Sequence, residues 1–195
     1  MITDKFIREL EEIVGKAHVS VSRANTELYS YDASLARGKP GVVVFPGDSR
    51  ETARIVRAAH RAGIPFVPRG FGTNLSGGTI VTVEGLVVCL SRLNRILGIY
   101  PEGRYAVAQP GVTNLELQDA LANIGFFYAP DPASQKVSTL GGNAGENSGG
   151  PRCLKYGVTT NHILGMEMIM PDGEVVRTGG AALDPPGYDL RGVVV

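Results

Sequence analysis

Two glycine-dense segments carry the strongest chemical signal in this 195-residue sequence. The first segment runs from Arg69 to Gly78, and the second runs from Ser138 to Gly150. Glycine lets backbone N–H groups converge and lets the chain approach a phosphate closely. The hydroxyl, amide and guanidinium groups between these glycines can bond phosphate or ribityl-type hydroxyls. We therefore expect both segments to contact a ligand that contains phosphate.

The spacing of the two segments predicts an elongated ligand. They are about 70 residues apart and would form two walls of one cleft, which suits a diphosphate with two ring systems. The main-chain amides of two turns would then converge on the diphosphate. Leu75 occupies the place of the third glycine of the dinucleotide fingerprint, so a standard Rossmann NAD site is disfavoured. Taken alone, the first segment fits a structural turn as well as a phosphate cradle.

Other catalytic arrangements are not visible in the sequence. The three histidines, His18, His60 and His162, lack the spacing of metal ligands, so no metal is expected. Cys89 lies in an apolar strand pattern and is interpreted as a core residue. No Ser-His-Asp or Cys-His constellation can be argued from spacing. The catalytic residues stay unknown, and a cofactor is expected to supply the chemistry.

Composition and charge limit the class of protein. Lys plus Arg and Asp plus Glu both number 19, so the net charge is zero and nucleic acid is a poor candidate partner. Two isolated cysteines suit a reducing cytosol. The longest clean apolar run, 86–90, is far too short to cross a bilayer, and the acidic first 15 residues fit no export signal. We expect a soluble, cytoplasmic protein that is not transmembrane.

An alternation of helix and strand is predicted to position the first segment. The expected elements are a helix, a buried strand, a helix and a strand, at residues 1–15, 41–46, 48–63 and 64–68. Asp48 and Glu51 form a capping-box pattern, while Gly15 and Gly63 end their helices. The βαβ unit should be parallel and right-handed. The first segment would then follow the carboxyl end of a strand, where α/β sheets bind ligands.

Hairpins and one more helix are predicted around the second segment. The expected elements are a strand at 86–91, a hairpin of 96–100 with 105–109, a helix at 113–125, and a hairpin of 162–170 with 174–178. The predicted lobes are residues 1–99, an α/β lobe, and residues 100–195, an antiparallel-rich lobe. No capping or turn residue comes after Val193–Val195, which predicts a chain cut inside an element of a longer parent protein. A docked edge strand is the alternative.

Several motifs resemble the FAD-binding domain of the vanillyl-alcohol oxidase and p-cresol methylhydroxylase superfamily. They are Pro68–Gly78, Pro130–Pro132, Ser138–Asn143, Glu146–Pro151 and Lys155–Gly157. The nearest branch resembles the flavoprotein subunit of glycolate oxidase and the D-lactate dehydrogenases. The resemblance implies an α+β, two-lobed fold, with a small parallel α/β lobe and a mainly antiparallel β-sheet lobe with helices. It also implies truncation at the C-terminus and an absent substrate cap domain.

The resemblance implies which residues contact FAD. In the first segment these are Pro68, Arg69, Gly70, Phe71, Gly72, Thr73, Asn74, Ser76, Gly77, Gly78 and Thr79, with Gly70–Asn74, Gly78 and Thr79 at the pyrophosphate. Along the ribityl chain and flavin ring they are Pro132, Ser138, Gly141, Gly142 and Asn143, and Thr139 is a further contact. Near the pyrophosphate, ribose or adenine they are Gly149, Asn161 and Ile163, and Asn147 is a further contact. Thr73 stands where some relatives attach the flavin to a histidine, so the FAD should be noncovalent.

The resemblance also implies an activity. The parent protein would oxidise a small 2-hydroxy acid by hydride transfer from C2 to flavin N5, while this chain alone would be inactive. Partners would be the hydroxy acid and other oxidase subunits, such as a second flavoprotein or an iron–sulfur subunit, which could hold the protein at the membrane periphery. One alternative is a stand-alone flavin-binding or electron-transfer subunit that needs a partner chain. Another is a relative of the cell-wall reductase that uses the same flavin fold.

Overall fold

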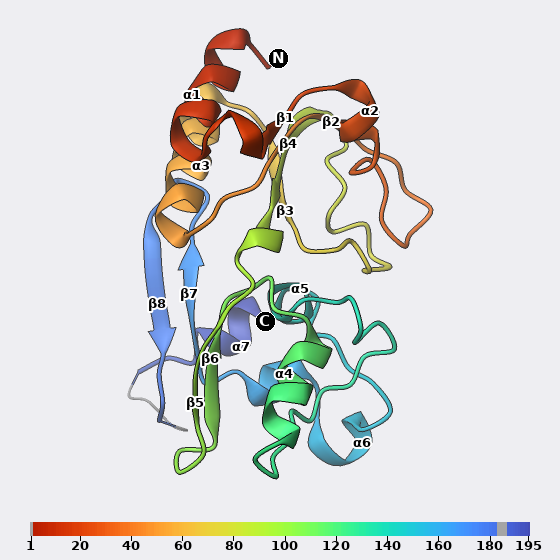
Figure 1. The fold of residues 1–195 in the computed structure, drawn as a ribbon, viewed down its shortest axis with the longest axis vertical. Coiled ribbons are helices and arrows are strands. Elements are labelled where there is room, and N and C mark those ends of the chain that lie inside the picture. The colour runs from red at the N-terminus through yellow and green to blue at the C-terminus, as the bar shows by residue number, and fades with distance from the viewer. Residues whose placement is uncertain (1, 183–186) are drawn as a thin grey trace. The chain divides into compact units, whose positions relative to one another are not determined.

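The structure, a computed structural model, describes residues 2–182 and 187–195 (Figure 1). The chain forms two units, each described separately below. Unit 1 comprises Met1–Leu93 and Ile169–Val176, and unit 2 comprises Asn94–Met168 and Arg177–Val195. The chain thus leaves unit 1, builds most of unit 2, and returns to unit 1 for eight residues. Among the helices that the structure describes, none is long and apolar enough to span a membrane.

A four-stranded sheet forms the centre of unit 1 (Figure 1). The strands are β1 (Val19–Ser20), β2 (Lys39–Val44), β3 (Phe66–Arg69) and β4 (Glu84–Cys89), in the order β1-β2-β4-β3. Both β2 and β3 run parallel to β4, which confirms the predicted parallel βαβ unit, while β1 is antiparallel to β2. The sequence did not predict that β4 lies between β2 and β3. All of Gly85–Cys89 is buried. A strand whose two faces are both apolar belongs in the interior of a parallel sheet, between two other strands.

Helices α1 (Asp4–Val14) and α3 (Ser49–Ala62) pack on one face of this sheet. Alternate strand residues reach that face, because successive side chains of a strand point to opposite sides. The shared core contains Phe6, Leu10, Ile55, Val42, Val44, Leu86 and Val88. On the other face Val43, Val87 and Cys89 form a second cluster with Val81, and Tyr29 and Phe45 pack against it. Cys89 is therefore a core residue, as predicted.

The helix ends of unit 1 follow the predicted glycines. α1 ends at Gly15 (φ +84°) and α3 ends at Gly63 (φ +62°), while Met1 of the predicted first helix lies outside the described residues. Asp48 caps α3, since its carboxylate accepts the Glu51 N–H at 2.7 Å. The other half of the predicted capping box is wrong: the Glu51 carboxylate accepts the Gly47 N–H at 2.6 Å. Arg92 lies 3.9 Å from that carboxylate and attracts it.

Unit 2 contains the predicted helix and most of the hairpin strands. Its elements are β5 (Ile96–Tyr100), β6 (Tyr105–Ala108), α4 (Asn114–Ala122), α5 (Leu140–Gly145), α6 (Cys153–Tyr156) and α7 (Arg191–Val194), together with most of the β7 (Gly165–Ile169) and β8 (Val175–Gly179) pair. The strands pair as β5-β6 and β7-β8, which confirms both predicted hairpins. His162 does not begin a strand as predicted, because Thr159–His162 form a 3-10 turn closed by the Asn161 side chain. Val193 and Val194 are helical and Val195 follows the helix, so the edge-strand alternative is wrong.

Candidate functional site

The first glycine segment is a loop that directly follows β3 in unit 1. Gly72 and Gly77 adopt positive φ angles of +72° and +78°, which favour glycine. Within the described residues, the backbone N–H groups of four consecutive residues, Phe71–Asn74, donate to no hydrogen bond. Successive free amides around glycine form anion-binding concavities. This loop therefore fits the diphosphate that was predicted for it.

Arg69 supports the loop from inside unit 1. Its side chain is buried, and Nη1 donates to the Thr79 hydroxyl at 3.2 Å. The guanidinium carbon also lies 5.5 Å from the centre of the Tyr29 ring. A Cβ atom on Gly72 would collide with this guanidinium. Gly72 is thus required by its contact with Arg69, whereas Arg69 as a direct phosphate ligand stays a prediction.

Asp32 is a functional candidate that the sequence reasoning missed. Its carboxylate is buried, accepts the Asn74 Nδ2 at 2.8 Å and lies 3.3 Å from the Thr79 hydroxyl. Burial raises the pKa of Asp32, but hydrogen bonds from Ser34, Asn74 and Thr79 outweigh it and hold the pKa below its usual range. The only local signal is an Asp two residues before Ser34, a common turn pattern. Nothing in that pattern points to the glycine loop.

The remaining predicted residues of the first segment lie on the same strand and loop. Pro68 and Arg69 are the last residues of β3, and the others are Gly70, Phe71, Gly72, Thr73, Asn74, Ser76, Gly77, Gly78 and Thr79. Phe71 is 54% exposed and Leu75 is 79% exposed, so two large apolar side chains face solvent beside the free amides. They provide apolar surface that a ring system of a ligand could cover.

The second glycine segment was predicted as a turn, and this is wrong. Residues 140–145 form the short helix α5, with Thr139 as its N-cap. The N–H groups at its start are already paired: those of Leu140 and Gly141 bond the carbonyls of Val112 and Pro110, both at 2.8 Å. Those of Gly142 and Asn143 bond Thr139 at 3.3 and 2.8 Å. These four amides cannot grip a diphosphate without breaking protein hydrogen bonds.

Buried side-chain atoms without partners offer the second segment a different role. Ser138 Oγ, Asn143 Nδ2 and Asn114 Oδ1 are buried and make no hydrogen bond with the described residues. The side chains themselves are 4%, 1% and 0% exposed. A buried polar group without a partner is unfavourable, and each such group needs an explanation. Hydroxyl and amide groups suit the ribityl hydroxyls and polar ring edge of a flavin, so Ser138 and Asn143 fit their predicted contacts.

Several predicted glycines are required by packing inside unit 2. A Cβ on Gly141 would lie 2.5 Å from the Pro110 side chain, and a Cβ on Gly149 would collide with Cys153 Sγ. A Cβ on Gly150 would collide with the carbonyl of Asp131, next to the predicted contact Pro132. The Asp131 carboxylate in turn lies 3.3 Å from the Arg152 guanidinium. The glycine density therefore lets segments of unit 2 approach one another closely.

Three other predicted residues hold the chain beyond the second segment. Asn147 has a φ of +47°, and its side chain accepts the Thr160 N–H at 3.0 Å. The Asn161 side chain accepts the Val158 N–H at 3.0 Å. The Ile163 carbonyl accepts a hydrogen bond from Arg191 at 3.2 Å. Nearby, burial raises the pKa of Tyr128 to about 12, although a hydrogen bond with Thr159 opposes this. These residues lie in unit 2, and their contact with a ligand stays a prediction.

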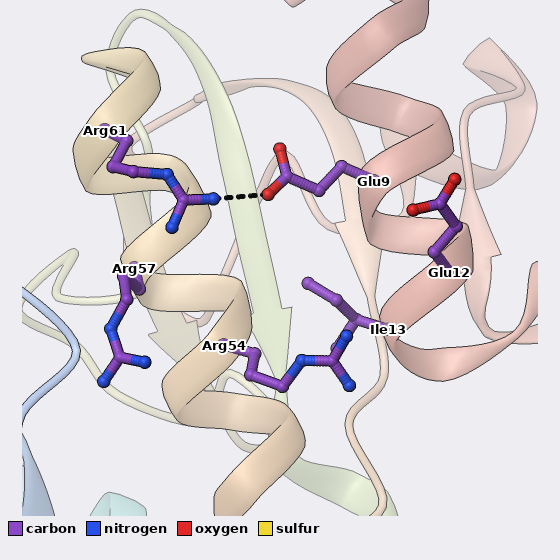
Figure 2. Close-up of a pocket in the computed structure, with 6 residues that line it drawn as sticks. All are labelled: Glu9, Glu12, Ile13, Arg54, Arg57 and Arg61. Atoms are coloured by element: carbon purple, nitrogen blue, oxygen red, sulfur yellow. Dashed lines mark hydrogen bonds and ion pairs between the residues drawn. The ribbon is translucent and has the colours of Figure 1, made fainter.

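A charged pocket of about 300 Å³ lies on the helical side of unit 1 (Figure 2). It is lined by Glu9, Glu12 and Ile13 of α1 and by Arg54, Arg57 and Arg61 of α3. Arg61 donates to Glu9 at 2.5 Å, and Arg57 donates to the Gly173 carbonyl at 3.0 Å. None of the predicted cofactor residues lines this pocket, and its glutamates disfavour a diphosphate. Over residues 2–182 and 187–195, no group of three or more His, Cys, Asp or Glu could hold a metal ion.

Comparisons with known proteins agree with FAD as the predicted ligand. Residues 40–179 match the family model described as FAD binding domain. The glycolate oxidase subunit GlcD of Bacillus subtilis is 43% identical over all of this chain and 42% of its own length, and the D-lactate dehydrogenase of Anaerostipes hadrus is 32% identical over all of this chain and 41% of its own length. The chain thus spans about two-fifths of these relatives.

A solved structure shares the fold. The structure of p-cresol methylhydroxylase with substrate bound superposes with a TM-score of 0.77 and 23% identity, over 95% of this chain and 36% of that protein. At this identity the likeness concerns the fold alone, and it agrees with the predicted α+β, two-lobed architecture. The chain therefore belongs to the FAD binding domain family, which confirms FAD as the predicted cofactor, and its relatives confirm the predicted resemblance to glycolate oxidase subunits and D-lactate dehydrogenases.

Proposed function

We propose that this chain is the FAD-binding portion of a flavin-dependent oxidoreductase that acts on small 2-hydroxy acids. The names of two relatives, a glycolate oxidase subunit and a D-lactate dehydrogenase, support this substrate class. The observation that carries the proposal is the run of four unpartnered amides at Phe71–Asn74 in a loop of a FAD binding domain. Such a loop is suited to a diphosphate, because successive free amides form an anion-binding concavity.

The chain's own residues would bind and orient the cofactor. The main-chain amides of Phe71–Asn74 would hold the diphosphate, and Ser138 Oγ and Asn143 Nδ2 would bond the ribityl chain or the flavin ring. Thr73 offers no imidazole for a covalent link, so we propose noncovalent FAD. Bound FAD would supply an acceptor for the hydride of the substrate's C2–H bond.

The substrate site and the proton acceptor are assigned to the part of the relatives that this chain does not span. The chain offers no acid–base constellation by sequence, and it spans about two-fifths of the two relatives named above. The word "subunit" in the name of the Bacillus relative supports further oxidase subunits as partners. A cytoplasmic protein, free or held at the membrane periphery by such subunits, is part of the same proposal.

The visible spectrum of the purified chain tests this proposal. We expect a yellow protein, or a colourless one that becomes yellow with added FAD, and we expect all of the flavin in the supernatant after acid precipitation. Flavin that remains with the precipitated polypeptide would contradict the noncovalent part. A chain that FAD cannot reconstitute would contradict cofactor binding.

Turnover assays separate the alternatives. With glycolate or D-lactate and an artificial electron acceptor, we expect no turnover from this chain alone and turnover from a longer chain that spans the relatives' full length. Turnover that appears only with a separate partner chain would favour the electron-transfer subunit. Reduction of the bound flavin by NADPH would favour the reductase relative.

A further inference from the structure

The buried carboxylate of Asp32 bonds the loop that carries the free amides of unit 1, although Asp32 itself lies in a stretch without any glycine motif. Asp32 follows α2 (Arg23–Glu27) and is 8% exposed. Burial of a carboxylate is unfavourable unless hydrogen bonds compensate for the lost water. Asp32 accepts the Ser34 N–H and Asn74 Nδ2, both at 2.8 Å. The Thr79 hydroxyl is a third donor, whose one proton is shared between Asp32 at 3.3 Å and Asn74 Oδ1 at 3.2 Å. Two of these donors belong to the glycine loop.

The contacts of Asp32 reach the middle and the end of that loop. Asn74 follows the four free amides, and Thr79 ends the segment. Thr79 also accepts a hydrogen bond from Arg69, the residue that precedes the loop, at 3.2 Å. The backbone strengthens the same connection, since the Ala33 N–H donates to the Gly72 carbonyl at 3.1 Å. The start, middle and end of the loop are thus all tied to residues 32–33.

Charge balance explains how an acid can lie close to a site for an anion. The Thr79 hydroxyl connects the Asp32 carboxylate to the buried guanidinium of Arg69. The negative charge of Asp32 and the positive charge of Arg69 therefore compensate each other inside unit 1. Asp32 engages the side chains of Asn74 and Thr79, whereas the main-chain amides of Phe71–Asn74 stay without partners. The acid therefore orders the loop and leaves its anion-binding donors available.

We propose that Asp32 is a positioning residue, which holds the loop of residues 70–79 in the conformation that binds the diphosphate without touching the cofactor itself. This inference rests on the proposed FAD binding by the same loop. Asp32 acts through Asn74 and Thr79, because its polar contacts with the loop's side chains run through those two residues. Removal of the charge should therefore affect FAD affinity far more than the stability of the sheet.

The test compares FAD affinity among four variants of the flavin-free chain, by titration of flavin fluorescence. The variants are Asp32→Asn, Asn74→Ala, their double variant, and Glu12→Gln, an exposed carboxylate of α1 that serves as the matched control. Loss of a hydrogen bond to a charged group predicts a Kd for FAD roughly tenfold or more higher for Asp32→Asn. Asn74→Ala should weaken binding as well, and the double variant should bind no more weakly than the weaker single variant, because both changes break one link. Glu12→Gln should bind FAD as the unmodified chain does.

Amide hydrogen exchange of the flavin-free proteins provides a readout that does not depend on FAD. We expect faster exchange of the Ala33 and Ile80 N–H groups, which bond the loop carbonyls of Gly72 and Gly77, in Asp32→Asn, with unchanged exchange in β2, β4 and α3. If Asp32→Asn does not fold, Thr79→Val takes its place, since it keeps the side-chain shape and removes the hydroxyl between Asp32 and Arg69.

Each outcome decides between the two proposals. Unchanged FAD affinity or unchanged exchange of the Ala33 and Ile80 N–H groups in the Asp32 or Thr79 variant would overturn the positioning role, as would additive losses in the double variant. An unmodified chain that binds no FAD would overturn the proposed function, and the exchange experiment would still decide whether Asp32 orders the loop.

Discussion

Gly72 shows that a glycine in a ligand-binding loop can be required by its packing against a neighbouring protein side chain. Its positive φ already favours glycine, and the direction in which a Cβ would point is filled by the Arg69 guanidinium. A side chain there must displace a buried, hydrogen-bonded arginine before it affects any ligand. The glycine and the arginine therefore form one structural pair.

Gly77 offers a matched control for a test of this pair. Both glycines have positive φ, but a Cβ on Gly77 would meet only Ala36 and Ser34, at an ordinary 3.9 Å. Each change to alanine should cost about 1–2 kcal/mol for the left-handed backbone, and Gly72→Ala should cost more because Arg69 must move. Gly72→Ala should also bind FAD more weakly than Gly77→Ala. Urea unfolding and FAD titration check this, and identical values for the two variants would show that the contact with Arg69 is unimportant.

The sequence predicted the loop but not its support. Glycine density, hydroxyls and a preceding strand are local features, so the segment at residues 69–78 could be found by inspection. Asp32 lies 42 residues before Asn74, and no spacing rule connects an aspartate in a turn with a distant amide. The orphan atoms of Ser138 and Asn143 were likewise invisible, because burial without a partner depends on packing rather than on residue type.

At the scale of elements, short helices were harder to predict than strands. Strand β4 has five consecutive buried residues, an apolar run that identifies it readily. Helix α5 contains three glycines, which disfavour a helix, and so the sequence predicted a turn. Its helical form depends on the Thr139 cap and on bonds from Leu140 and Gly141 to residues 110–112. Tertiary contacts of this kind override local propensity.

The turn between β7 and β8 contacts α3 and yields a prediction at this scale. Gly173 has a φ of +84°, and a Cβ there would lie 2.7 Å from the Ala53 carbonyl and 2.8 Å from the Arg57 Cβ. Gly63, at the end of α3, has a similar φ and nothing within 4 Å of its Cβ position. We expect Gly173→Ala to destabilise the protein by about 1–3 kcal/mol more than Gly63→Ala, since only the first overpacks a contact. Chemical denaturation measures both, and equal losses would indicate that the turn does not pack on α3 in solution.

At the scale of the whole molecule, ligand binding should appear as stability. FAD at about 100 times its Kd should add ~2.7 kcal/mol, which corresponds to roughly 5–10 °C in Tm for a chain of this size. Riboflavin lacks the diphosphate that the Phe71–Asn74 amides would hold, so it should shift Tm far less. Differential scanning calorimetry with each ligand tests this. An equal shift by riboflavin would place the binding energy in the ring rather than in the loop.

The return of residues 169–176 to unit 1 has a consequence for synthesis on the ribosome. Sheet, helices and glycine loop of unit 1 are all translated by residue 93, yet the turn that packs on α3 through Gly173 emerges only after most of unit 2. During synthesis, unit 1 therefore stays incomplete, and the Arg57 side chain lacks its carbonyl acceptor, until about 80 more residues have been added. Completion of the two units is for this reason coupled in time, and a stop codon anywhere between them leaves both unfinished.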